Sequence, residues 1–157
     1  MRKLLISAVF VFVAAVSGLA IAGAPDPVIG AWKLNASKST FTAGPALKTQ
    51  TRTYSQSGPT ITLVMKSVGA DGSETTSKTS YQLDGKDYPV AGNADFDSLS
   101  PQQVDSNTAM FTLKKGGKKV GTTERTVSKD GKTLTTIMKL TTAKGERSES
   151  ELVFDKQ

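Results

Sequence analysis

Glycine-containing dipeptides recur in two regular series along this 157-residue chain, and their spacing restricts the fold more than any other feature. Within each series the dipeptides lie thirteen or fourteen residues apart: Ser57-Gly58, Asp71-Gly72 and Asp84-Gly85, then Gly116-Gly117, Asp130-Gly131 and Lys144-Gly145. Such pairs suit tight hairpins, because the turn residues need positive φ angles that glycine adopts without steric cost. The spacing therefore predicts consecutive antiparallel strands of about ten residues each.

The segments between these turns have the composition and periodicity of half-buried strands. They are rich in threonine and β-branched residues, and apolar side chains recur at every second position. Three segments show one apolar face clearly, made by Ile61, Leu63 and Met65, by Ala109, Phe111 and Leu113, and by Leu134, Thr136, Met138 and Leu140. We predict ten strands, at 28–36, 48–56, 60–68, 74–82, 86–91, 101–105, 108–115, 118–128, 133–142 and 147–155.

A long meander of this kind leaves an unpaired edge at each end unless it curls and closes. We therefore predict an all-β fold, an antiparallel up-and-down β-barrel of eight to ten strands. An open or two-sheet β structure is the alternative. Residues 88–101 contain Pro89, Gly92 and Pro101, and we expect this stretch to be mostly loop.

The first residues have the layout of a secretory signal peptide. Arg2 and Lys3 precede an apolar run from Leu4 to Val16, and small residues follow up to Ala22. The apolar run is shorter than the roughly 20 residues of a membrane-spanning helix, so we expect cleavage and no integral membrane span. We predict a leader at 1–22, a single domain at 23–157, and a periplasmic or secreted location.

Histidine and cysteine are both absent, which removes the usual general base, the usual zinc ligands and any disulfide. We find no paired-carboxylate motif or calcium-loop spacing, so we expect no catalytic residue, no metal and no cofactor. The formal charge falls from +6 to +4 when Arg2 and Lys3 leave with the leader, and this charge is too small and scattered to indicate nucleic-acid binding. We expect a monomeric, non-enzymatic binding protein.

The single tryptophan, Trp32, lies two residues after Gly30 on the first predicted strand. We expect Gly30, Trp32 and Leu34 to face inward, with the indole buried near one end of the barrel and the glycine leaving room for it. Burial of a tryptophan in any other β core is the alternative.

The stretch GAWKLNASKS resembles the Gly-x-Trp opening of the calycins, the superfamily of lipocalins and intracellular fatty-acid-binding proteins. TTERTVSKDGKTLT is similar to a strand hairpin of the retinoid-binding branch, and ELVFDK is similar to the last strand of that family. The chain also resembles small exported bacterial lipocalin-like proteins. The resemblance implies a barrel that carries a small apolar or amphipathic ligand.

The chain departs from that family in two places. Family members insert two helices between their first and second strands, whereas only residues 37–47 fill this interval here. Family members also hold a ligand carboxylate with Arg-x-Tyr on the last strand, where this chain has Leu152, Val153 and Phe154. The resemblance places a second clamp arginine at Arg125. We therefore expect ligand binding that does not depend strongly on a carboxylate.

The predicted ligand-binding residues are Arg125, Arg52, Tyr54, Tyr81 and Trp32. Arg52 and Tyr54 share one face of their strand, and an inward orientation would make the barrel interior partly polar. The alternative is that Arg52 and Tyr54 face outward and that Arg125 lies on the outer face beside Glu124. The alternative function is a protein-interaction or inhibitor module that uses the barrel-rim loops, in particular 88–101, with no internal ligand.

Overall fold

The computed structural model describes residues 25–42 and 47–157, so the predicted leader at 1–22 lies outside the described residues. The described residues contain one single-turn 3-10 helix, η1, at Ala36–Lys38. The strands are β1 (Gly30–Leu34), β2 (Thr40–Phe41), β3 (Leu47–Ser57), β4 (Thr60–Gly69), β5 (Glu74–Tyr81), β6 (Tyr88–Ala91), β7 (Ser98–Gln103), β8 (Thr108–Lys115), β9 (Lys118–Val127), β10 (Thr133–Thr141) and β11 (Arg147–Lys156). In this part of the chain, no helix is long and apolar enough to cross a membrane.

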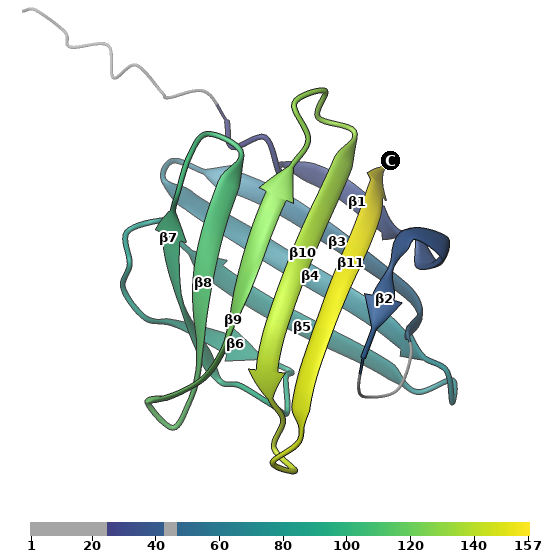
Figure 1. The fold of residues 1–157 in the computed structure, drawn as a ribbon. Helices are drawn as coiled ribbons and strands as arrows, with labels where there is room; N and C mark the ends of the chain where they lie inside the picture. The colour runs from purple at the N-terminus through teal and green to yellow at the C-terminus, as the bar shows by residue number, and fades with distance from the viewer. Residues whose placement is uncertain (1–24, 43–46) are drawn as a thin grey trace, which may run out of the picture.

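Ten of these strands close into one antiparallel barrel, as Figure 1 shows. From β3 to β11 each strand pairs with the next one in the sequence, and β1 pairs with both β3 and β11. The closing pairs join Trp32 to Lys156, Lys33 to Asp155 and Leu34 to Phe154. The prediction of an all-β, up-and-down barrel is confirmed, with ten strands at the upper end of the predicted range.

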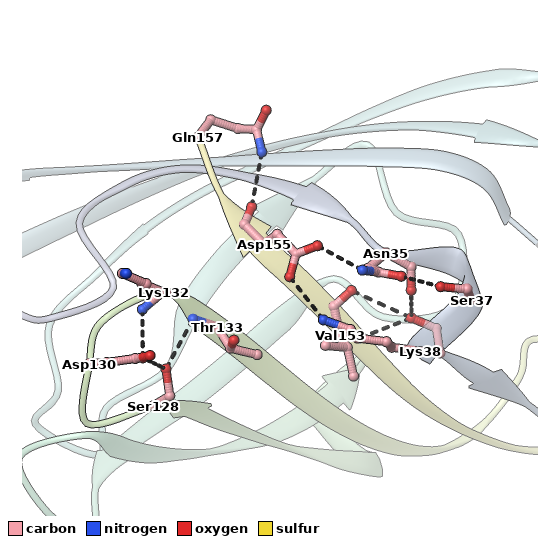
Figure 2. Close-up of polar contacts among 11 residues, drawn as sticks. Asn35, Ser37, Lys38, Ser128, Asp130, Lys132, Thr133, Val153, Asp155 and Gln157 are labelled. Carbon is pink, nitrogen blue, oxygen red and sulfur yellow. Dashed lines mark hydrogen bonds and ion pairs between the residues drawn. The ribbon is translucent and has the colours of Figure 1, made fainter.

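The first predicted strand, at 28–36, is shorter in the structure, where β1 spans Gly30–Leu34. β1 ends at Leu34, η1 follows, and β2 then resumes the pairing with β11. Asn35 holds the interruption against β11, because its side-chain amide donates to Asp155 Oδ2 at 2.7 Å (Figure 2). The backbone N–H of Asn35 also donates to the carbonyl of Val153 at 2.8 Å. These contacts are with a strand far along the chain, so the local pattern does not indicate the break.

The two predicted strands that meet the stretch 88–101 are both present, since β6 lies within the predicted 86–91 and β7 overlaps the predicted 101–105. β7 begins earlier than predicted, at Ser98, so the stretch contains less loop than we expect from its prolines and glycine. Pro101 lies within β7 and pairs with Phe111 of β8. Its carbonyl faces away from β8 and accepts the N–H of Gly85 at 2.7 Å, so its nitrogen also faces that side. The pairing of β6 with β7 ends before Pro101, so the proline disrupts no hydrogen bond of that ladder.

The predicted apolar faces point into the barrel. Ala109, Phe111 and Leu113 of β8 are all buried, while the residues between them are partly exposed. The same alternation buries Leu134, Thr136 and Leu140 of β10. Their side chains, with those of the other strands, form one core cluster along the barrel axis.

Trp32 is fully buried, as predicted, at the barrel end covered by the segment that precedes β1. Its Nε1 donates to the carbonyl of Val28 at 2.7 Å, and Lys156 Nζ lies 5.0 Å from the indole centroid. Gly30 has a φ of 130°, and a Cβ there would lie 3.1 Å from Lys156 Cε. The glycine therefore leaves room for the lysine stem beside the indole, rather than for the indole itself.

The β6–β7 loop, residues 92–97, folds back onto the opposite end of the barrel and buries Phe96 in the core. The carboxylate of Asp95 accepts the N–H of Ala143 in the β10–β11 hairpin at 3.0 Å. The carboxylate of Asp97 accepts a backbone N–H of the β8–β9 hairpin at 2.9 Å. In Figure 1 these hairpins lie at the end of the barrel away from the segment that precedes β1. The loop is therefore tied to the barrel rather than projecting from it.

Gly92 begins this loop with a φ of 76°, and a Cβ there would lie 2.0 Å from the carbonyl oxygen of Thr76. We expect Gly92→Ala to lower the free energy of unfolding by about 1–3 kcal/mol more than Gly72→Ala does. Gly72 is the matched control, because its φ is also positive but an added Cβ meets no atom within 4 Å. Urea unfolding of the two variants measures the difference. Equal destabilisation would show that the contact with Thr76 is unimportant.

Candidate functional site

A cavity of about 90 Å³ lies inside the barrel. Every strand from β3 to β11 contributes to its wall, which is mainly apolar and includes hydroxyl and guanidinium groups. The lining residues are Arg52, Tyr54, Leu63, Met65, Ser77, Lys78, Thr79, Tyr81, Val90, Phe96, Leu99, Phe111, Leu113, Thr123, Arg125, Thr136, Met138 and Leu152. This cavity is the candidate binding site.

The structure brings four of the five predicted ligand-binding residues together around this cavity, namely Arg52, Tyr54, Tyr81 and Arg125. The side chains of Arg52 and Arg125 are inside the barrel, since these residues are only 9% and 3% exposed. The alternative of an outward-facing Arg125 beside Glu124 is therefore wrong. Trp32 does not line the cavity and packs instead in the covered end of the barrel.

Arg125 forms a buried ion pair with Asp26. Its Nη2 lies 2.8 Å from Asp26 Oδ2, and the two side chains are 3% and 10% exposed. Its Nη1 donates to the Tyr81 hydroxyl at 3.2 Å, and its guanidinium carbon lies 5.8 Å from the Phe111 ring centroid. Arg125 Nε is buried without a hydrogen-bond partner among the described residues. The arginine that the family resemblance assigns to a ligand carboxylate is thus paired with a carboxylate of the chain itself.

Asp26 reaches the interior from the segment that precedes β1. Its Oδ1 accepts the N–H of Val28 at 2.9 Å, and its own N–H donates to Gln56 Oε1 at 3.1 Å. The same segment places the carbonyl of Val28 on the Trp32 indole. These contacts hold the segment over one end of the barrel, with Asp26 directed at Arg125.

Tyr81 supplies a neutral hydroxyl at the cavity. Burial raises the pKa of this hydroxyl well above its ordinary value, and the opposing charge of Arg125 only partly offsets that effect. The ring packs edge-on against Phe111, with the centroids 5.5 Å apart. Because the Tyr81 oxygen accepts from Arg125, its own proton is available for a hydrogen-bond acceptor in the cavity.

Arg52 has a different environment from Arg125. Its Nε donates to Gln50 Oε1 at 2.9 Å, and Gln50 Nε2 in turn donates to Ser67 Oγ at 2.8 Å. Its guanidinium carbon lies 4.4 Å from the centroid of the Phe154 ring, a distance suited to a cation–π contact. Among the described residues, no carboxylate forms an ion pair with Arg52.

The volume of the cavity limits what it can hold. Pockets for drug-sized ligands measure about 300–1,000 Å³, and an apolar cavity of about 150 Å³ accommodates benzene. A volume of about 90 Å³ therefore suits a compact molecule of a few heavy atoms. A long acyl chain does not fit unless the wall moves.

Three residues that shape this site are not singled out by the sequence pattern. Gln50 had a usable signal, because it shares the inward face of β3 with Arg52 and Tyr54. Phe96 lies in an expected loop, where burial is not predicted. Asp26 lies between two prolines before the first strand, and no periodicity marks it.

No metal-binding group is evident in the described part of the chain, because no three carboxylates gather there in a suitable arrangement. The cavity lining also contains no carboxylate. What the lining residues offer is an apolar surface, hydroxyl groups and two guanidinium groups, which can bind and orient a small molecule.

We expect Asp26→Asn to lower the free energy of unfolding by about 3–5 kcal/mol, because it leaves the buried Arg125 charge without its counterion. Glu149→Gln is the matched control, since it breaks an exposed ion pair with Lys139 and should cost about 1 kcal/mol or less. Chemical denaturation measures both changes. A double variant Asp26→Asn/Arg125→Met should lose less stability than the sum of the single changes, and strict additivity would contradict the pairing.

Tyr81 also predicts a pH dependence. Because the pKa of Tyr81 is raised in the folded state, its stabilising effect is complete below about pH 10, the ordinary tyrosine pKa, and declines as the pH rises above that value. Tyr81→Phe should therefore lose less stability between about pH 9 and pH 11 than the wild type, by roughly 1 kcal/mol. Urea midpoints at several pH values test this. Identical slopes for the two proteins would mean that Tyr81 does not control the alkaline loss.

Comparisons with known proteins address the fold. No protein-family model matches the chain, and no curated protein matches it. Among solved structures, the chain is similar to the crystal structure of Rv2717c from M. tuberculosis, with a TM-score of 0.53 and 14% sequence identity. The similarity covers 83% of this chain and 93% of that protein. At this level of identity the likeness concerns the fold alone, and the closed ten-strand barrel agrees with a calycin-like architecture only in outline.

Proposed function

We propose that this protein is an exported, non-enzymatic carrier whose barrel binds a small apolar or amphipathic molecule. The observation that carries the proposal is the cavity of about 90 Å³, with a mainly apolar wall and the polar groups of Arg52, Tyr54, Tyr81 and Arg125. A concave, mostly apolar pocket with a few polar groups is the usual form of a small-molecule site.

The residues of the cavity divide into two roles in this proposal. Leu63, Met65 and Leu113 supply surface for the apolar part of the ligand. Tyr81 offers a hydroxyl proton to a polar group of the ligand, and Arg125 holds that hydroxyl in place from the far side. Because Asp26 neutralises Arg125, the role of Arg125 is to orient Tyr81 rather than to select an anion.

The proposal extends to lineage and location. We place the chain with the exported lipocalin-like proteins of the calycin superfamily, outside the cytoplasm. The Gly-x-Trp opening, the closed meander and the leader features at 1–22 support this placement. The lack of histidine and cysteine supports a binding role rather than catalysis.

The arrangement of the β6–β7 loop favours a carrier over a protein-interaction module. An inhibitor that acts through its barrel rim needs an ordered loop that projects toward the partner. Here the loop 92–97 buries Phe96 and is hydrogen-bonded to two neighbouring hairpins. The loop 92–97 therefore packs onto the barrel and does not project toward a protein partner.

The test is to fill the cavity without altering the outer surface. We expect Leu63→Phe to weaken binding of 1-propanol, a neutral amphiphile of four heavy atoms, by about ten-fold or more, because the larger side chain occupies the cavity. Val64→Phe is the matched control, since Val64 neighbours Leu63 on β4 but does not line the cavity. Isothermal titration calorimetry measures the affinities, and circular dichroism checks that both variants remain folded.

Failure of the folded wild-type protein to bind 1-propanol or other compact apolar probes would contradict the carrier proposal and favour the interaction module. Equal weakening by Leu63→Phe and Val64→Phe would place the binding site outside the cavity.

A further inference from the structure

The charges inside the barrel do not balance. Two guanidinium groups, of Arg52 and Arg125, are buried there, and Asp26 is the carboxylate that pairs with one of them. The cavity lining contains no Asp or Glu side chain, and its third basic residue, Lys78, is exposed. The buried groups of the described interior therefore carry a net charge of +1, which resides on Arg52.

The guanidinium of Arg52 has unused hydrogen-bonding capacity. An arginine offers five N–H donors, and the one on Nε is taken by Gln50 at 2.9 Å. Gln50 is held in this orientation because its amide nitrogen donates to Ser67. The N–H groups on the two terminal nitrogens of Arg52 have no hydrogen-bond acceptor among the described residues, and Arg52 lines the cavity.

A buried charge is costly unless a counterion or several hydrogen bonds compensate for it. The Phe154 ring, 4.4 Å from the guanidinium carbon, compensates in part and keeps the guanidinium plane in position. An anion that accepts from the terminal nitrogens would supply both the missing hydrogen bonds and the opposite charge. A carboxylate suits this role well, because its two oxygens match the spacing of two guanidinium N–H groups.

We propose that Arg52 is an anion-binding residue and that the barrel takes a compact monocarboxylate. This inference rests on the proposed carrier function and narrows its ligand class. A single negative charge matches the net charge of +1, and the volume of about 90 Å³ matches a short apolar body of a few carbon atoms. That body lies against the apolar wall that includes Leu63, Met65 and Phe111.

This inference revises the expectation that binding does not depend on a carboxylate. That expectation follows from the last strand, where Leu152 and Phe154 replace the clamp residues of the family. The structure gives Phe154 another role, as the aromatic surface beside Arg52 on a strand far away in the sequence. The anion site that we propose is therefore on β3 rather than on β11.

The test compares propionate with 1-propanol, two probes that share a three-carbon chain and differ in charge. We expect the wild-type protein to bind propionate about ten-fold or more tightly than 1-propanol at neutral pH. Arg52→Met should remove this preference while it retains binding of 1-propanol. Lys66→Met is the matched control, because it removes a cation from the outer face of neighbouring β4 and should leave the preference unchanged.

The outcomes separate this inference from the carrier proposal. Equal binding of both probes by the wild type, or an unchanged propionate preference in folded Arg52→Met, would overturn the assignment of Arg52 while leaving the carrier proposal intact. Binding of neither probe to the folded wild type would overturn both. If Arg52→Met does not fold by circular dichroism, the wild-type comparison and Lys66→Met decide the matter, since a propionate preference lost in Lys66→Met would assign the anion site to the outer surface.

Discussion

Closure of the barrel between β1 and β11 is the interaction on which the rest of the structure depends. A meander of ten strands has two unpaired edges until its ends meet, and here they meet through three residue pairs that begin at Trp32 and Lys156. The chain has no cysteine, so no disulfide reinforces this contact. β2 extends it along β11, and the buried indole supports it from inside. Closure also creates the interior, because it directs one face of every strand from β3 to β11 toward a common cavity.

Within that interior, the two arginines have opposite roles. The Arg125 charge is neutralised by Asp26, and this ion pair ties the segment before β1 to β9. The Arg52 charge is only stacked on Phe154 and bonded to a neutral amide. Both arginines line the cavity. Arg125 mainly holds the covered end of the barrel together, whereas the terminal N–H groups of Arg52 have no acceptor among the described residues. The family resemblance points to the first as the ligand contact, whereas the geometry points to the second.

The predictions from sequence succeeded where the signal was local. Turn glycines and alternation depend on residues a few positions apart, so the strands and the inward face of Ile61, Leu63 and Met65 could be derived. The interruption at Asn35 and the start of β7 at Ser98, ahead of the predicted residue 101, could not. Both depend on pairing with other segments, with β11 in the first case and with β6 and β8 in the second. The local pattern does not contain these partners.

The sequence by itself determined the all-β barrel, the burial of Trp32 and the common face of Arg52 and Tyr54, because a period of two places alternate side chains on one side of a sheet. Whether that common face points inward was decided by the tertiary structure. Only the tertiary structure decided what each arginine contacts and how large the cavity is. Asp26 and Arg125 are 99 residues apart, and no pattern in the chain links them. The cavity volume likewise results from side chains of nine strands packing together, so it is a property of their joint arrangement and of no single segment.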